Sequence, residues 1–213
     1  MLINDPSDQR FTAAQKQAEI EKAQEQFVLD TRCLKDVSSV TIVAGTSEYN
    51  LPSDIFSVLR VAHNGKKLES ISAYELDVLL NSDWSDDEGT PSRYYVDTDP
   101  NNKKIRFYPI PQSGDASVTT TIEYIKIPPA LSADASVPLD GHTLLTPYHD
   151  ALAYWAAASL LGILPDQAAL FMISQYDKEY RGLVDKCIDT FRGMGEQRPI
   201  NIYRGRNPDN IGR

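Results

Sequence analysis

The sequence predicts an α+β fold: a helical bundle of long helices, a β-rich insert that interrupts it, and an extended C-terminal arm. Three observations support this prediction. Apolar residues recur at helical spacing over residues 7–36 and 166–192. Between them, residues 38–128 hold short alternating runs separated by turn residues, typical of a small sandwich or barrel-like sheet. Residues 193–213 follow neither period and carry Gly, Pro and Asn every few positions.

These patterns divide the chain into four predicted parts. Residues 1–37 are the N-terminal helix of a helical module, and residues 38–130 are the β-rich insert. Residues 131–192 continue the helical module, and residues 193–213 are the extended arm. A chain of 213 residues is long enough to bury a core of its own.

The first helix is predicted from about Ser7 to Asp36. Asp5 and Ser7 flank a proline, and either side chain can cap the free amides of a first helical turn. The apolar positions lie among Gln, Glu and Lys at close to helical spacing. They are Phe11, Ala14, Ala18, Ala23, Phe27, Cys33 and Leu34.

The β-rich insert contains one strong turn signal. Asn64-Gly65 predicts a tight hairpin, because this pair readily adopts the positive φ angles that such a turn needs. A second hairpin is predicted around residues 98–103. The strands expected from alternation are residues 40–44, 58–62, 67–71, 94–97, 104–109 and 118–126, with a short helix or turn at 74–81.

The rest of the chain is organised around Thr146–Leu164, TPYHDALAYWAAASLLGIL, its most apolar stretch. Pro147 suits a first helical turn, and Thr146 can cap it. A helix that is apolar nearly all round is a buried one. Asp150 in the first turn and the closing Gly162–Pro165 argue against a membrane span. We expect this alanine-rich helix to be the hub on which other helices, or a copy of itself, pack.

A second long helix is predicted from about Asp166 to Arg192. Cys33 and Cys187 both fall in helical patterns without metal-ligand spacing, so we expect them to be reduced core residues of a cytosolic protein. The first ten residues contain no apolar run, which predicts neither a signal peptide nor a membrane anchor.

The charge of the chain is unevenly distributed. The net charge of −9 argues against broad nucleic-acid binding by the outer surface. Residues 193–213 carry four Arg against one Glu and one Asp, so they contribute +2 and residues 1–192 contribute −11. This terminal stretch is either a frayed end or an arm that orders on a partner. The candidate contact residues of the arm are Arg198, Ile200, Ile202, Tyr203, Arg204 and Arg206.

Catalytic and metal-binding patterns are thin. His63, His142 and His149 lie at a predicted turn, a loop and a helix start, and no two are spaced to share a metal. The stretch 97–102 has the acidic start of a calcium loop but lacks its glycine and final glutamate. The acidic loop Trp84–Pro91 is either solvated or a contact to a basic neighbour. We therefore predict no catalytic residue, no metal and no cofactor.

Six fragments occur in a fixed order between about residues 40 and 165, and together they resemble the head-to-tail adaptor (connector, neck) proteins of tailed bacteriophages. The long flanking helices fit the shape of that family. Short-tailed phages carry a similarly arranged adaptor in the tail tube. The fragments are Tyr49–Val61 (YNLPSDIFSVLRV), Asn64–Leu68 (NGKKL), Thr90–Val96 (TPSRYYV), Ile105–Pro111 (IRFYPIP), Glu123–Pro128 (EYIKIP) and Tyr148–Leu152 (YHDAL).

The resemblance implies a structural virion protein of the neck, the head-tail junction, assembled in the host bacterial cytoplasm. Adaptors of this kind form a ring, usually a dodecamer, beneath the portal protein. The ring extends the DNA channel used in genome ejection and receives the next tail or nozzle protein. An acidic lumen repels phosphate, so double-stranded DNA is expected to pass without specific binding. The arm is expected to grip the portal or the adjacent subunit.

Two alternatives remain open at this point. A tail-tube or head-completion (stopper) protein is close in class to an adaptor. A β-rich enzyme domain that cuts a host polymer is a different class, in which Asp86 and Glu88 would have to supply the acid and the base. Carboxylates so close in sequence on one loop are poor candidates for a fixed catalytic pair.

Overall fold

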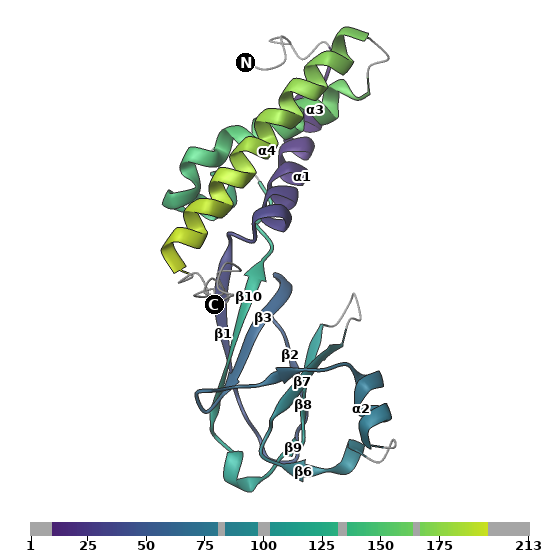
Figure 1. The fold of residues 1–213 in the computed structure, drawn as a ribbon, viewed down its shortest axis with the longest axis vertical. Coiled ribbons are helices and arrows are strands. Elements are labelled where there is room, and N and C mark those ends of the chain that lie inside the picture. The colour runs from purple at the N-terminus through teal and green to yellow at the C-terminus, as the bar shows by residue number, and fades with distance from the viewer. Residues whose placement is uncertain (1–9, 81–83, 98–102, 132–135, 164–166, 196–213) are drawn as a thin grey trace, which may run out of the picture. The chain divides into compact units, whose positions relative to one another are not determined.

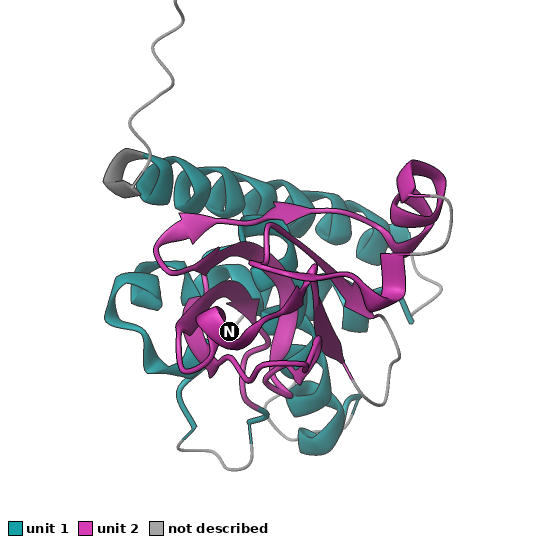
Figure 2. Ribbon diagram, turned by 90° about the horizontal axis from the view of Figure 1, so that it is seen from below, with its two compact units in different colours: residues 1–33, 130–213 teal, residues 34–129 magenta. Residues whose placement is uncertain are grey.

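A computed structural model shows a mixed helical and sheet protein, which confirms the α+β class. The chain divides into two compact units, each described separately below (Figure 2). Unit 1 combines residues 1–33 and 130–213, whereas unit 2 is the continuous stretch 34–129. The structure describes residues 10–80, 84–97, 103–131, 136–163 and 167–195.

The first helix, α1 (Ala13–Thr31), begins later than predicted. Thr12 caps it: the Gln15 N–H donates to Thr12 Oγ1 at 3.2 Å, and the Thr12 N–H donates to Gln15 Oε1 at 2.9 Å. This reciprocal pair satisfies two amides that would otherwise lack partners. The predicted start at Ser7 is therefore wrong, because the described residues just before Ala13 are not helical.

α1 also ends earlier than predicted. Arg32 adopts a left-handed conformation with φ of 52°, and its N–H donates to the Val28 carbonyl at 2.8 Å, which closes the last turn. Cys33 and Leu34 are buried but lie beyond the helix. The predicted end at Asp36 is wrong, since that residue already belongs to a strand.

The alanine-rich stretch forms α3 (His149–Leu161), preceded by a 3-10 turn over Thr143–Tyr148. Pro147 lies inside that turn, so the α-helix starts at His149, two residues later than predicted. Thr146 does not cap it; the Thr146 carbonyl instead accepts a hydrogen bond from the His149 N–H. The long α4 (Gln167–Gly195) follows.

In unit 1, α3 packs against both α1 and α4, as its alanine content predicts (Figure 1). Ala151, Ala156, Ala157 and Ala158 are buried on α3, and their small side chains allow the neighbouring helices to approach closely. Phe27 of α1 is fully buried at the same interface. The core of unit 1 is thus formed by one helix from the N-terminal part of the chain, α1, and two from the C-terminal part, α3 and α4.

The first sheet of unit 2 is fully antiparallel. Asn64 and Gly65 join two of its strands with φ of 49° and 76°, which confirms the predicted hairpin turn. The long strand predicted at residues 118–126 is also present. The strand order is β1 (Lys35–Thr41), β10 (Thr119–Lys126), β3 (Ile55–His63) and β4 (Lys66–Lys67).

The second sheet of unit 2 explains why one predicted strand is wrong. Residues 67–71 are not a single strand, because Leu68 donates to the Val61 carbonyl of the first sheet while Glu69 donates to Ser92 beside the second. The chain therefore crosses between sheets at the buried Leu68. The order of the second sheet is β2 (Glu48–Asn50), β8 (Lys104–Tyr108), β7 (Arg93–Asp97) and β5 (Glu69–Ser70), with β5 parallel to β7.

Both sheets contribute to one apolar core. Val61 and Ile122 from the first sheet and Ile105 and Phe107 from the second are all nearly inaccessible to solvent. A short parallel pair, β6 (Glu88–Gly89) and β9 (Ile110–Pro111), lies outside these sheets. The helix α2 (Ala73–Leu80), predicted as a short helix or turn, follows β5. Brief 3-10 turns occupy Trp84–Asp86, Ser113–Asp115 and Leu139–Gly141.

Candidate interaction surfaces

The contact residues expected from the sequence belong to the segment that follows α4. Helix α4 carries the chain to Gly195, and residues 196–213 lie outside the described part of the structure. The arm therefore stays a prediction, and the described surfaces are considered on their own. The predicted residues concerned are Arg198, Ile200, Ile202, Tyr203, Arg204 and Arg206.

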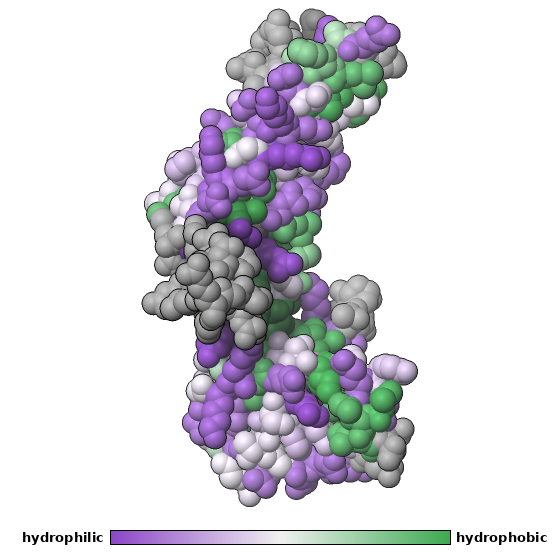
Figure 3. Space-filling model, in the orientation of Figure 1, coloured by the Kyte–Doolittle hydropathy of each residue, from purple (hydrophilic) through white to green (hydrophobic). Residues whose placement is uncertain are grey.

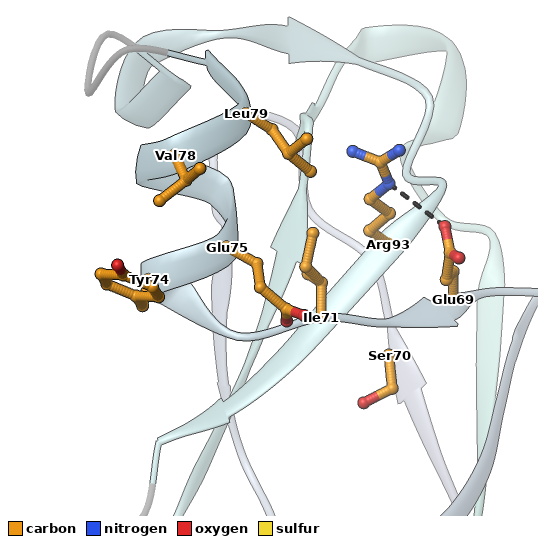
Figure 4. A pocket seen from close by; sticks show the side chains of 8 residues that line it. All are labelled: Glu69, Ser70, Ile71, Tyr74, Glu75, Val78, Leu79 and Arg93. Atoms are coloured by element: carbon orange, nitrogen blue, oxygen red, sulfur yellow. Dashed lines mark hydrogen bonds and ion pairs between the residues drawn. The ribbon is translucent and has the colours of Figure 1, made fainter.

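An apolar groove of about 330 Å³ lies on unit 2, beside helix α2 (Figure 4). Tyr74, Val78 and Leu79 of α2 are 75%, 62% and 60% exposed. Figure 3 shows this apolar surface over α2. We call it the α2 groove; it is lined by Glu69, Ser70, Ile71, Tyr74, Glu75, Val78, Leu79 and Arg93.

The sequence holds α2 in place through its first turn and one buried side chain. The Ser72 N–H donates to Glu75 Oε2 at 2.8 Å, and the Glu75 N–H donates to Ser72 Oγ at 3.1 Å. The Glu75 carboxylate accepts hydrogen bonds from the Ser72 N–H and from the Ser72 hydroxyl. Both bonds lower the pKa of Glu75, and the backbone N–H has the larger effect. Leu76 is fully buried and anchors the helix. Tyr74, Val78 and Leu79 of α2 are left facing solvent.

Contacts of Trp84 tie the middle of α2 to the second sheet. The Trp84 indole N–H donates to Asp77 Oδ1 at 2.7 Å. Its ring meets Tyr95 and Tyr108 edge-on, with centroid distances of 5.9 Å each. The Tyr108 hydroxyl in turn donates to Asp87 at 2.9 Å, and burial together with this acceptor raises the pKa of Tyr108. Trp84 is thus half-buried rather than simply solvated.

The surroundings of the α2 groove are acidic. Residues 69–92 contain seven Asp or Glu residues and no Lys or Arg. Arg93 Nε lies 3.3 Å from Glu69 Oε2, which neutralises part of this charge (Figure 4). Asp86 and Glu88, the carboxylates that an enzyme would need, are both exposed.

Unit 1 has two surfaces of its own. At the junction of α3 and α4, exposed apolar side chains include Ile163, Leu170 and Phe171, and Figure 3 shows apolar surface there. A polar groove of about 490 Å³ lies elsewhere on this unit, and three of its seven lining residues are aspartates. Its lining residues are Asp30, Trp155, Asp177, Tyr180, Arg181, Val184 and Asp185.

A buried cluster of a His, an Asp and a Thr has the composition of a catalytic triad, but a substrate has no access to it. His63 Nδ1 lies 2.8 Å from Thr120 Oγ1, and His63 Nε2 lies 3.4 Å from Asp115 Oδ1. All three residues are at most 6% exposed, so no substrate can reach the hydroxyl. The cluster joins β3, β10 and a 3-10 turn. The sequence placed His63 in a turn, whereas it is the last residue of β3.

The two cysteines interact with each other inside unit 1. Both are free and buried, as expected, although Cys33 is not helical. A hydrogen bond between the thiols lowers the pKa of Cys33, and the same contact, with burial, raises the pKa of Cys187.

Over the described residues, no group of three His, Cys, Asp or Glu side chains is arranged to hold a metal ion. None of the described helices has the length and apolarity needed to cross a membrane.

Comparison with known proteins gives one result that covers almost the whole chain. No curated protein matches it. The model of one family, described as SU10 adaptor protein, matches residues 2–200, which include both units. This agrees with the resemblance to phage head-to-tail adaptors carried by the six ordered fragments. The chain belongs to the SU10 adaptor protein family.

Proposed function

We propose that this chain forms a ring, a dodecamer, beneath the portal protein of a phage head. The ring would extend the DNA channel and receive the next tail or nozzle component. The observation that carries this proposal is the match to the adaptor family over residues 2–200. The neck of the virion is the corresponding location.

The surfaces of both units suit a protein whose work is binding. Unit 2 offers the α2 groove, and unit 1 offers exposed apolar side chains where α3 meets α4. Exposed apolar surface of this kind marks contacts with other proteins. An adaptor in a ring needs such contacts with two neighbouring copies as well as with the components above and below.

The charge of the chain suits a DNA conduit. A net charge of −9 repels phosphate, and a lumen that does not hold DNA lets it slide through. Residues 196–213, by contrast, carry four Arg against one Glu and one Asp, a net charge of +2. Residues 196–213 are the proposed attachment segment, docking on the portal or on the adjacent subunit.

The chemistry of the attachment segment fits that role. Arg198, Arg204 and Arg206 can each form two hydrogen bonds with a carboxylate, and Ile200 and Ile202 add apolar contact. Ordering the segment on docking costs entropy, so the affinity of one copy is modest. A ring of copies multiplies that affinity.

Deleting residues 196–213 tests this proposal. The deletion leaves the described helices and sheets intact, so the melting temperature stays within about 2 °C of that of the full chain. Attachment to portal-bearing heads, measured by co-sedimentation, is expected to be lost. A matched control keeps the length and composition of residues 196–213 but scrambles their order. Normal attachment of the deletion variant would contradict the proposal.

A further inference from the structure

We propose that the α2 groove binds residues 196–213 of a second copy of this chain. This inference rests on the proposed function, because a closed ring needs a contact that repeats from each copy to the next. It chooses the adjacent subunit, rather than the portal, as the site that receives the attachment segment. Three properties of the groove and of the segment support it.

The first property is unpartnered apolar surface. Val78 and Leu79 project from α2, and Figure 4 shows Leu79 and Ile71 facing the space between α2 and Arg93. Water around such side chains is released when apolar groups cover them. The segment supplies apolar groups of matching size in Ile200 and Ile202.

The second property is opposite charge. Residues 69–92 carry seven acidic residues and no basic one, whereas residues 193–213 carry four Arg against two acids. Arg93 lines the groove, but it already pairs with Glu69 at 3.3 Å. The Glu69 side chain is still 72% exposed, so its carboxylate can accept further bonds from an arginine.

The third property is spacing along an extended chain. Alternate side chains of a strand face the same side, so Ile200 and Ile202 share one face with Arg198 and Arg204. At about 3.3 Å per residue, the two isoleucines lie ~7 Å apart and the flanking arginines ~20 Å apart. An eight-residue helix is ~12 Å long, so the isoleucines can cover α2 while the arginines reach beyond its ends.

The segment is also biased towards this conformation. A residue that precedes proline favours extended backbone, and Arg198 precedes Pro199. Pro199 has no N–H group to donate. In an extended segment its ring would lie on the face opposite the isoleucines and would not interfere with their contacts. The segment therefore loses less conformational entropy when it docks.

The experiment uses the full-length chain with the photo-crosslinking amino acid p-benzoylphenylalanine at position 202, where it replaces Ile202 and lies on the face shared with Ile200. Equal amounts of ¹⁵N-labelled and unlabelled chains are mixed, irradiated at increasing protein concentration and digested for mass spectrometry. The expected result is crosslinks between a labelled and an unlabelled chain, with residues 69–92 as the acceptor. High salt should reduce their yield, since exposed charges are screened.

Two matched variants sharpen the measurement. Val78→Asp places a charge in the groove and is expected to lower the yield of these crosslinks about tenfold, equivalent to ~1.4 kcal/mol. Val43→Asp makes the same change at a similarly exposed position outside the groove, 55% against 62%, and should leave the yield within about twofold. Circular dichroism confirms that both variants fold.

Three outcomes would overturn the inference. Crosslinks within single chains only would show that the segment does not reach a second copy. Crosslinks to the acidic groove of unit 1 would place it elsewhere. An absence of crosslinks between copies at the highest soluble concentration would exclude the contact. The assay contains no portal, so its failure is distinguishable from failed attachment to heads.

Discussion

Different kinds of interaction stabilise the interior of each of the two units. Helices satisfy their own backbone groups, so the specific long-range contacts of unit 1 come from side chains. Ser159 Oγ donates to Glu19 at 2.6 Å, and the Tyr180 hydroxyl donates to Asp30 at 2.6 Å. The Leu139 N–H donates to Gln24 Oε1 at 3.2 Å. Each bond joins segments more than a hundred residues apart.

Unit 2 is held instead by backbone ladders. β10 pairs with β1 on one side and β3 on the other, over seven residue pairs each. Its exposed pairs, such as Arg60 with Glu123, contribute little, because solvent screens them. Side-chain changes should therefore affect unit 1 most, whereas changes in backbone conformation should affect unit 2 most.

The largest expected effect comes from Phe27→Ala in unit 1. Phe27 is fully buried, and its ring lies 6.4 Å from that of Tyr148 and 6.5 Å from that of Tyr180. Removing it leaves a cavity and costs ~3–5 kcal/mol. Hydrogen exchange should show faster opening of the α1, α3 and α4 amides while the amides of β10 stay protected. Equal loss of protection in both units would contradict their independence.

A smaller effect is expected from Tyr180→Phe. The change removes the hydroxyl that donates to Asp30 and is expected to cost ~1–2 kcal/mol, measured by urea unfolding at 222 nm, where the helices dominate. Leu183→Ala, on the same helix and only half-buried, serves as a control for a side-chain deletion without a lost hydrogen bond.

Tyr180→Phe also tests how the stability of unit 1 depends on pH. Burial, with the bond to Asp30, raises the pKa of Tyr180 above its unfolded value of about 10. The folded state therefore keeps this proton more tightly, and the stability it contributes is complete below pH ~10 and is lost as the pH rises further. Unit 1 should lose stability above pH ~10, and Tyr180→Phe should lose less. If the stability of the wild type and of Tyr180→Phe fell in parallel as the pH rises, Tyr180 would be ruled out as the cause.

An effect no larger than that of Tyr180→Phe, and confined to unit 2, is expected from Gly65→Val. Gly65 has φ of 76° with nothing within 4 Å of an added Cβ, so the cost is backbone strain alone, ~1–2 kcal/mol. Gly114→Val is the matched control, since it has the same open space without a positive φ. The helical signal at 222 nm should be unchanged. Its disappearance would mean that the two units fold as one.

Local signals with a single physical cause were predictable from the sequence. Asn64-Gly65 specified its turn because few other pairs tolerate two positive φ angles. β10 was predictable because alternation over eight residues fits only a half-buried strand. The α+β class followed from the change of period between the two regions.

Features set by distant partners were not predictable. Arg32 ends α1 in a left-handed conformation without the glycine that usually marks such an end. The α2 groove was missed because Val78 and Leu79 look like core residues until the structure shows that only Leu76 of α2 is buried. The His63–Asp115 contact joins residues 52 positions apart, and no local pattern reports it. The predicted arm remains untested.

The discontinuity of unit 1 sets an order of events during synthesis. Unit 2 is one continuous stretch, so all of its sheet partners exist once the ribosome has passed Pro129. Helix α1 emerges earlier but has to wait for α3 and α4 before Phe27 can be covered. At ~5–20 residues per second, unit 2 takes several seconds to be translated. The many Gln, Glu and Lys residues of α1 favour contact with water, which suits a helix whose partners are not yet made.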